Sequence, residues 1–341
     1  MYLGGNLIWK LISFPRIDLF TKPTPVEKLF KLSSEYSVDF FVKRDDVMEP
    51  WFGGNKARKL EFIFGEIVSK KYNAVITRGS YYSNHVRLTT IIARKLGIEP
   101  YIVTYPPNPE TKLFYQGNVL LNKIFGANII EVRDNAEADR EMFYLKNELE
   151  KQGYKPYIIP VGGSTPLGVL GYALAVFELM NQLKSMNVKP KYIVHATGTG
   201  TTQAGLILGL KLLGVEDVRV IGINTEKKEL EENLVSTIIE LIQKTVDLLK
   251  VSNINISEND VLIYSEYTFG GYGVVNNELI SFIKNIARKE GLLLDPVYTG
   301  KAFYGLLDLI EKGEIPRGEK IVFIHTGGLP ILFQMFDKFI E

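Results

Sequence analysis

The feature that most constrains the fold is an alternation of short apolar runs with longer segments of helical periodicity. From about residue 39 onward, apolar runs are separated by stretches whose apolar residues recur every three or four positions. One such stretch places Leu60, Ile63 and Ile67 on one face of a helix, just after the apolar run 40–43. Short buried strands that alternate with helices predict parallel sheets covered by helices on both faces. We therefore predict an α/β fold.

The same patterns give approximate element limits and show no internal repeat or low-complexity linker. The expected strands are 40–43, 74–77, 101–104, 129–132, 157–161, 193–196, 218–223, 261–264 and 321–325. The expected helices begin near residue 60 and continue with 86–96, 119–125, 136–152, 169–183, 202–213, 227–250, 277–289, 301–311 and a last helix. Ligands of open α/β sheets bind beyond the carboxyl ends of the strands, so we expect two α/β domains that share a cleft.

Charge and composition exclude several classes of protein. The 40 basic and 39 acidic residues leave a net charge of +1, which predicts no surface for nucleic acid or anionic membrane. The absence of cysteine excludes disulfides and thiolate chemistry, and three scattered histidines predict no metal site. No apolar stretch is long enough to span a bilayer, and the first residues lack the basic region of a signal peptide. We therefore expect a soluble, cytoplasmic protein.

The first candidate site loop contains Gly53, Gly54, Asn55 and Lys56. Asn55 is a suitable helix N-cap, and Lys56 then lies on the first turn, where the helix dipole disfavours its ammonium form. A lysine that loses its charge readily can form a Schiff base. The alternative is that Lys56 is a solvated lysine on a capped helix. Taken alone, this loop favours that alternative.

The second candidate loop, 196–205, joins a strand to a helix and is rich in glycine and threonine. Backbone N–H groups converge at a helix N-terminus, so this loop predicts an anion site suited to a phosphate. A dinucleotide site is the alternative, because Glu226 follows the next strand. However, the spacing of the glycines at 198, 200 and 205 is not that of a dinucleotide-binding loop. We therefore favour a phosphate site over a dinucleotide site and over a simple turn.

Three further loops carry polar residues. Ser83, Asn84 and His85 open a helix whose donors could hold a carboxylate, although a capped helix with a half-buried histidine is the alternative. Tyr272 and Tyr298 are candidate acid–base groups, although packing is the commoner role of a tyrosine. A last strand-end loop contains Thr326, and His195 is expected to be a core residue.

Together the loops resemble one family. The motifs GGNKARKL, YYSNHVR, GGSTPLGVLGY, ATGTGTTQAG, DPVYTGKAF and HTGGLP occur in the order found in pyridoxal-phosphate enzymes of the tryptophan-synthase-β type. The chain is similar to the branch that contains 1-aminocyclopropane-1-carboxylate (ACC) deaminase and D-cysteine desulfhydrase, from about residue 15 to the C-terminus. The resemblance implies two open twisted sheets flanked by helices (PLP fold type II), with pyridoxal 5'-phosphate in the cleft between the domains.

The resemblance also implies domain limits, partners and residue roles. Residues 1–59 and 170–341 would form a larger cofactor domain and 60–169 a smaller one, in a homodimer that acts on a small amino acid. The implied catalytic residues are Lys56, Ser83, Tyr272 and Tyr298. The implied cofactor-binding residues are Lys56, Asn84, Gly198, Thr199, Gly200, Thr201, Thr202 and Thr299. The implied substrate-binding residues are Ser83, Asn84, His85, Tyr272, Tyr298 and Thr326.

Two departures from the ACC deaminase pattern guide the choice of reaction. That pattern has Ser-Asn-Gln where this chain has His85 at the third position, and Tyr-Glu where this chain has Tyr298 and Thr299. In the deaminase the glutamate faces the pyridine nitrogen and strengthens the electron sink, which a neutral threonine cannot do. Because ACC has no α-hydrogen, its ring must be opened at an inert methylene. A β-elimination needs only loss of the α-proton and a good leaving group, so a weaker electron sink suffices.

The sequence therefore predicts a lyase that eliminates hydrogen sulfide from D-cysteine, or a related D-amino acid, and yields pyruvate and ammonia. The first alternative is ACC deaminase, which yields 2-oxobutyrate and ammonia. Eliminations from D-serine, β-chloro-D-alanine or cysteate also remain open. A non-catalytic amino-acid-binding protein is the most distant alternative, and Lys56 together with both tyrosines weighs against it.

Overall fold

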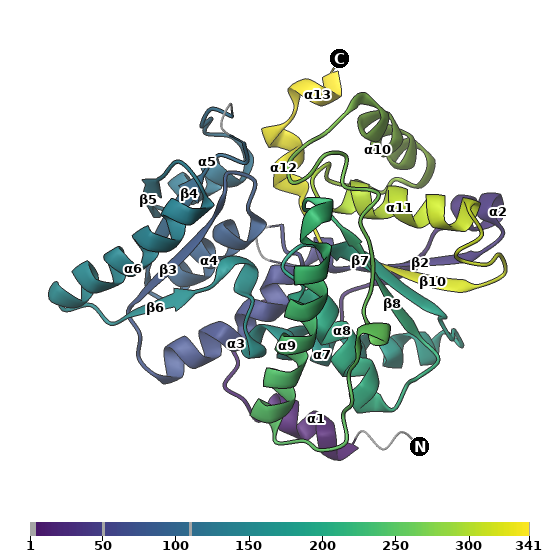
Figure 1. Ribbon diagram of the computed structural model, residues 1–341, viewed down its shortest axis with the longest axis horizontal. Helices are drawn as coiled ribbons and strands as arrows, with labels where there is room; N and C mark the ends of the chain where they lie inside the picture. The colour runs from purple at the N-terminus through teal and green to yellow at the C-terminus, as the bar shows by residue number, and fades with distance from the viewer. Residues whose placement is uncertain (1–4, 50–51, 109–110, 341) are drawn as a thin grey trace.

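The protein contains two sheets, which lie on opposite sides of the molecule (Figure 1). We describe a computed structural model that covers residues 5–49, 52–108 and 111–340. The six-stranded sheet has the order β1 (Val26–Lys28), β2 (Asp39–Arg44), β10 (Lys320–His325), β7 (Tyr192–Thr197), β8 (Arg219–Asn224) and β9 (Leu262–Tyr264). The four-stranded sheet has the order β5 (Asn128–Glu131), β4 (Glu99–Tyr105), β3 (Ala74–Ser80) and β6 (Pro156–Ile159).

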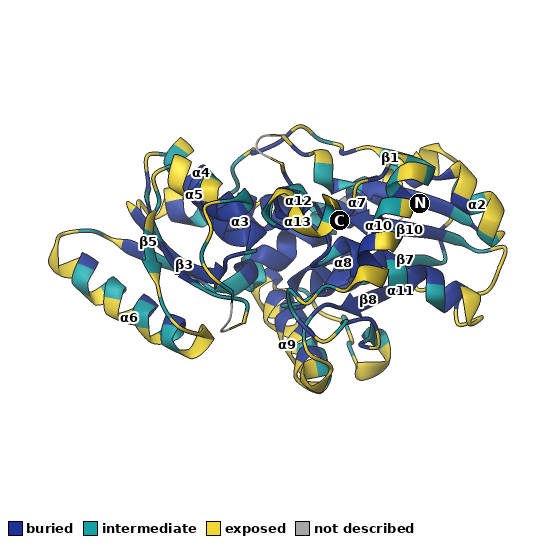
Figure 2. Cartoon of the chain, turned by 90° about the horizontal axis from the view of Figure 1, so that it is seen from above, coloured by how far each residue is buried: buried dark blue, intermediate teal, exposed yellow. Residues whose placement is uncertain are grey.

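All described strand pairs are parallel except β1 with β2. The helices cover these sheets, and burial is concentrated where they pack together (Figure 2). They are α1 (Gly5–Ile12), α2 (Phe30–Tyr36), α3 (Asn55–Ser69), α4 (Asn84–Lys95), α5 (Gly117–Ile124), α6 (Asn135–Lys151), α7 (Pro166–Ser185), α8 (Thr201–Leu213), α9 (Glu231–Leu249), α10 (Asn277–Glu290), α11 (Thr299–Glu311), α12 (Leu329–Gln334) and α13 (Asp337–Ile340). This parallel α/β architecture confirms the predicted fold class.

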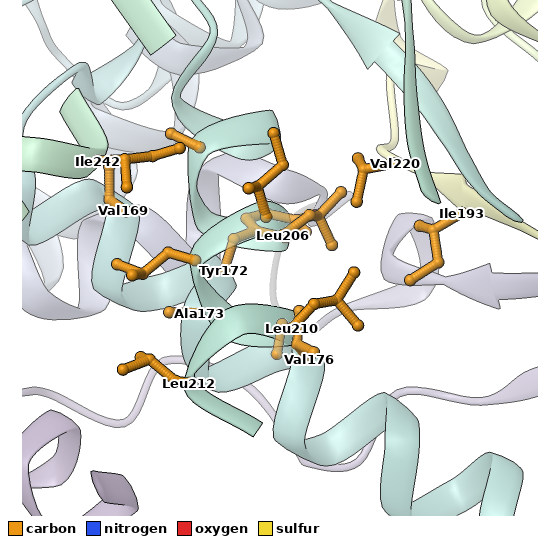
Figure 3. Packing of buried hydrophobic residues seen from close by; sticks show 14 of the residues in the cluster. Val169, Tyr172, Ala173, Val176, Ile193, Leu206, Leu210, Leu212, Val220 and Ile242 are labelled. Carbon is orange, nitrogen blue, oxygen red and sulfur yellow. The ribbon is translucent and has the colours of Figure 1, made fainter. Parts of the chain in front are cut away.

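The largest apolar cluster among the described residues joins α7 and α8 to β7 and β8 of the six-stranded sheet (Figure 3). Thr165 is the N-cap of α7, and its side chain accepts the N–H of Gly168. Pro166 occupies the first position of the helix, which suits a residue without an N–H. The two helices approach closely because α8 turns glycines toward α7. A Cβ at Gly205 would lie only 2.4 Å from the Cβ of Tyr172. This contact fixes α8, and with it the glycine loop in front of α8.

Three N-terminal elements, α1, β1 and α2, were not expected from the sequence. β1 has three residues and α2 has seven, which is too short for a clear periodic pattern. The expected helix 227–250 begins instead at Glu231, after a separate 3-10 turn over Lys228–Leu230. The expected strand 157–161 ends at Ile159, and after Pro160 a 3-10 turn over Val161–Gly163 follows, in which Gly162 adopts a left-handed conformation (φ 68°).

The strands of the smaller sheet, β3 to β6, are consecutive in the chain and all lie between residues 74 and 159. The strands of the larger sheet come from the segments before and after them. The proposed limit between residues 59 and 60 falls inside the continuous helix α3, and the limit between 169 and 170 falls inside α7. The domain limits therefore stay a prediction. Across the described ranges, none of the helices has the length and apolar character needed to cross a bilayer.

The close approach of α7 and α8 predicts that Gly205→Ala destabilises the protein. The added methyl group would force the helices apart, at a cost of about 1–3 kcal/mol in the free energy of unfolding. Chemical denaturation measures this difference. Ser236→Ala, on the exposed face of α9, is the control and should change stability by less than about 0.5 kcal/mol. Equal stability of the two variants would contradict the tight packing.

Candidate active site

A cleft of about 770 Å³ lies beyond the carboxyl ends of strands from both sheets. Ser80 comes from the end of β3, Thr197 from the end of β7, and Glu226 and Thr326 follow β8 and β10. This is the edge at which open α/β sheets bind ligands, and the volume suits a small molecule.

The cleft brings together all but one of the residues assigned to the site from the sequence. Those that line it are Lys56, Ser83, Asn84, His85, Gly198, Thr199, Gly200, Thr201, Thr202, Tyr272, Tyr298 and Thr326. Thr299 is not among the lining residues. His195 is fully buried within β7 and also lies outside the lining.

Lys56 is the second residue of α3, and a tight turn before it directs its side chain into the cleft. Gly54 adopts φ 105°, and a Cβ there would lie 2.5 Å from the carbonyl oxygen of Thr326. The Nζ of Lys56 lies 3.5 Å from the carbonyl oxygen of Gly162. Burial lowers the pKa of Lys56 to about 8. About a tenth of this amine is therefore neutral, and thus nucleophilic, at pH 7, far more than for an ordinary lysine.

A buried ion network holds the start of α3 in place. Arg58, two residues after Lys56, donates from Nε and Nη2 to the carboxylate of Asp45, each at 2.8 Å. Its Nη2 also donates to Glu178 of α7 at 2.9 Å. The backbone oxygen of Asp45 accepts the N–H of Gly54 at 2.9 Å, so the same residue also fixes the turn before Lys56.

A second lysine in the cleft, Lys59, was missed in the sequence analysis. It lies three residues after Lys56, on the same face of α3, and is almost completely buried. Burial, and then the neighbouring Lys56, lower the pKa of Lys59 well below its usual value. Two adjacent buried amines repel each other when both are charged, so this part of the cleft favours an anionic ligand.

The glycine loop forms a cradle at the N-terminus of α8. The first N–H groups of a helix have no partner within it, and those of α8 begin where Gly200 turns the chain with φ 76°. The Oγ1 of Thr201 donates to Ser164 at 3.0 Å, and Asn55 of α3 donates to the Oγ1 of Thr202 at 3.0 Å. A neutral amine and an anion cradle in one cleft fit pyridoxal phosphate, which carries an aldehyde and a phosphate.

A second helix N-terminus, that of α4, faces the same cleft. The Oγ of Ser83 accepts the N–H of Val86 at 3.2 Å and caps the helix. The Oδ1 of Asn84 accepts a hydrogen bond from Asn118 at 3.0 Å, which leaves the amide nitrogen of Asn84 as its donor. This end of the cleft therefore offers donors to a carboxylate or to a ring hydroxyl.

The His85 side chain has a different character from the one expected. Thr77 donates its hydroxyl hydrogen to Ile159 at 2.8 Å, so the 3.0 Å contact between His85 Nε2 and Thr77 is a hydrogen bond donated by the histidine. Burial holds the pKa of His85 well below its usual value. The ring is therefore neutral and its buried Nδ1 is an acceptor without a partner among the described residues. This geometry does not favour the ring as a carboxylate donor.

Tyr272 and Tyr298 form a hydrogen-bonded pair inside the cleft. Their hydroxyl oxygens are 2.6 Å apart, and Ser80 donates to the Tyr272 hydroxyl at 3.0 Å. Burial raises the pKa of both phenols well above the usual value. Both groups are therefore protonated at neutral pH and are suited to donate a proton rather than remove one.

Thr299 lies outside the cleft lining, and its hydroxyl is hydrogen-bonded to Asp295. Its hydroxyl donates to the Asp295 carboxylate at 2.7 Å and accepts the N–H of Asp295 at 2.8 Å. The same carboxylate accepts the N–H groups of Val297 and Tyr298 at 2.9 Å each. Thr299 thus closes the turn that starts α11. The expectation that it faces a cofactor nitrogen has no geometric support, whereas Thr326 does line the cleft.

Besides Lys59, three charged residues of the cleft were not assigned to it beforehand, namely Arg78, Glu226 and Lys227. Glu226 was considered only as a dinucleotide ligand, yet its Oε1 lies 3.5 Å from the position of a Cβ on Gly198, and burial raises its pKa. Arg78, within β3, donates to both carboxylate oxygens of Asp139 at 2.6 and 3.0 Å. The available signal for Glu226 was its position just after the end of β8, whereas Arg78 lies within β3.

Comparisons with known proteins agree with this cleft chemistry. A family model described as pyridoxal-phosphate dependent enzymes matches residues 17–327. The chain therefore belongs to this family of pyridoxal-phosphate-dependent enzymes, and pyridoxal phosphate is its cofactor.

Relatives of two activities match nearly the whole chain. A protein of Pyrococcus abyssi, provisionally named 1-aminocyclopropane-1-carboxylate deaminase, is 41% identical over 333 residues, which cover 97% of each chain. The D-cysteine desulfhydrase of Serratia proteamaculans is 37% identical over 333 residues, which cover 96% of this chain and 98% of that one.

Solved structures show the same fold. The crystal structure of an ACC deaminase homologue matches with a TM-score of 0.88 and 40% identity, covering 98% of both chains. A threonine deaminase of Solanum lycopersicum matches with a TM-score of 0.63 and 20% identity, covering 95% of this chain and 84% of that one. This second likeness concerns the fold alone.

The lowered pKa of Lys56 predicts a distinctive pH dependence. In the cofactor-free protein, the neutral fraction of Lys56 rises with pH, with a midpoint near 8. Competitive acetylation over a pH series, read by mass spectrometry, measures this midpoint. Lys70 is the control, since a hydrogen bond to Glu66 holds its pKa above 10.5. Acetylation of both lysines with one common midpoint would contradict the effect of burial.

The position of Thr299 predicts that Thr299→Glu mainly costs stability. A second carboxylate beside the buried Asp295 would place two like charges together in the interior, and we expect a loss on the order of 3 kcal/mol in the free energy of unfolding. Thermal denaturation, with Thr299→Ser as a control that keeps the hydroxyl, measures the effect. A stable Thr299→Glu enzyme with increased ACC turnover would instead support a cofactor contact at this position.

Proposed function

We propose that this protein catalyses β-elimination of D-cysteine, or of a related D-amino acid, to pyruvate, ammonia and sulfide. The observation that carries the proposal is a protonated phenol pair, Tyr272 and Tyr298, in the same cleft as the low-pKa amine of Lys56. Elimination requires one group that removes a proton and another that supplies one, and this cleft contains both. Bound pyridoxal phosphate supplies the electron sink that stabilises the carbanion.

Lys56 has the properties of the group that removes the α-proton. It would hold the cofactor covalently in the resting enzyme and become a free amine when the substrate amine replaces it. With a pKa of about 8, the freed amine accepts a proton near neutral pH without a large energetic penalty. The oxygen of Gly162, 3.5 Å away, helps to orient it.

The tyrosine pair has the properties of the proton donor. The leaving thiolate of cysteine departs more readily when its sulfur receives a proton. Because burial keeps both phenols protonated, either Tyr272 or Tyr298 can donate, and the 2.6 Å hydrogen bond between them stabilises the phenolate that remains. Ser80, which donates to Tyr272, supplies a further hydrogen bond to that oxygen.

The remaining roles concern binding. The N-terminus of α4, with Ser83 and Asn84, offers N–H donors for the substrate carboxylate or the cofactor hydroxyl. The N-terminus of α8 and the loop from Gly198 to Thr202 offer the donors for the cofactor phosphate.

ACC deaminase is the second candidate. The named relatives from Pyrococcus species favour it, and so does Glu226, an acidic side chain within the described cleft. We place it second because an acid–base pair is sufficient for elimination but does not by itself open a cyclopropane ring. Homodimer formation and a cytoplasmic location stay predictions from the family resemblance; light scattering tests the first.

The decisive experiment compares D-cysteine, L-cysteine and ACC with the purified, cofactor-loaded protein. We expect pyruvate and sulfide from D-cysteine, and Lys56→Ala should abolish both the turnover and the borohydride-reducible bond to the cofactor. Enzymatic assays of 2-oxoacid and sulfide measure the products. Formation of 2-oxobutyrate from ACC without sulfide from D-cysteine would establish the second candidate instead.

A further inference from the structure

A buried lysine outside the cleft has no part in the chemistry derived above. Lys301 of α11 is completely buried and does not line the cleft. Its Nζ donates to two backbone oxygens, those of Thr268 and Gly271, each at 2.7 Å. Lysine is rarely found in a protein interior. Here the two hydrogen bonds of its amine connect α11 to a single loop.

The loop that Lys301 contacts is the one that carries Tyr272. Phe269, Gly270, Gly271 and Gly273 all have positive φ, at 55°, 100°, 119° and 73°. Within the loop, the Thr268 oxygen accepts the N–H of Gly271 at 3.0 Å, and the Gly271 oxygen accepts the N–H of Val274 at 3.2 Å. The two oxygens that Lys301 bonds therefore belong to the two turns that shape this loop.

Lys301 also lies on the turn that carries the other tyrosine. Tyr298 is the N-cap residue of α11, and Lys301 follows three residues later, within the first turn. One helical turn thus presents the Tyr298 phenol and also holds the loop that presents the Tyr272 phenol. The short hydrogen bond between the phenols joins these two segments, which are far apart in sequence.

Other described contacts also hold the loop, since Gly273 lies close to Tyr82 and Pro107 and the Tyr272 ring packs against an apolar cluster. Phe269 packs edge-on against Tyr304, with ring centres 5.2 Å apart, and this anchors the start of the loop. Ser80 reaches the loop only through the Tyr272 phenol itself. Lys301 donates to the backbone oxygens of Thr268 and Gly271, and Gly271 directly precedes Tyr272.

We propose that Lys301 is a positioning residue that holds the Tyr272 phenol against Tyr298 by hydrogen-bonding the backbone of the loop 268–273. The proposal rests on the proposed function for the role of the two phenols in catalysis, but the contact itself does not. Two measurements therefore test the contact and its catalytic effect separately.

The first measurement is hydrogen exchange of the holoenzyme, read by mass spectrometry. In Lys301→Met, which keeps the length of the stem and removes the donors, amides of the peptide that contains residues 268–274 should exchange faster than in the wild type. Lys155→Met is the control, because Lys155 also donates to a backbone oxygen, that of Lys70, at 2.6 Å, and lies next to β6 of the smaller sheet. It should leave this peptide unchanged. Unchanged exchange in Lys301→Met would overturn the proposal.

The second measurement is a double-mutant cycle with Tyr272→Phe. Lys301→Met should reduce kcat for D-cysteine by about 10- to 100-fold, as expected for a displaced catalytic group, while the cofactor absorbance is retained. In the Tyr272→Phe background the same change should reduce kcat less than about 3-fold, since the positioned hydroxyl is already absent. Equal factors in both backgrounds would show that Lys301 does not act through Tyr272.

The outcomes distinguish the two proposals. If the wild type does not turn over D-cysteine, the proposed function fails, and hydrogen exchange alone decides the role of Lys301. If Lys301→Met does not yield a folded holoenzyme, Lys301→Gln replaces it, because its amide keeps donors on a shorter stem. Exchange of the 268–274 peptide in that variant should again be faster than in the wild type.

Discussion

The site depends on one constraint, that parallel strands deliver the N-termini of their following helices to the same edge of a sheet. Lys56, Asn84 and Thr201 lie in the first turn of helices that follow strands, and Tyr298 is the N-cap of α11, which follows α10. The positive ends of four helix dipoles therefore converge on one cleft. This arrangement favours anions and neutral amines, which are the forms that a phosphate, a carboxylate and a reactive lysine require.

Burial then separates the roles of the titratable groups. The same loss of hydration lowers the pKa of an amine and raises that of a phenol, so Lys56 tends toward its basic form while Tyr272 and Tyr298 keep their protons. No specific partner is needed to assign the acid and the base. The polar network of Arg58 and Asp45 contributes differently, by fixing where the lysine lies.

The sequence predicted the fold class, and all but one of the residues assigned to the site line the cleft, because strand-end loops rich in glycine and threonine are local signals. Thr299 shows the limit of this reasoning, since only the folded chain reveals that Asp295 takes up its hydroxyl. Lys59 could have been found from its spacing to Lys56. Lys301 could not, because its partners are backbone atoms of a loop about 30 residues away in sequence. The elements α1, β1 and α2 were too short to give a periodic signal.

The two anion-binding helix ends belong to different sheets, with α8 following β7 of the larger sheet and α4 following β3 of the smaller one. A ligand that contacts both ends at once therefore acts as a bridge between the two halves of the molecule. Its binding free energy adds directly to the resistance of the whole chain to unfolding. In a cell, the supply of cofactor and substrate would thus help to set how long each copy of this protein survives.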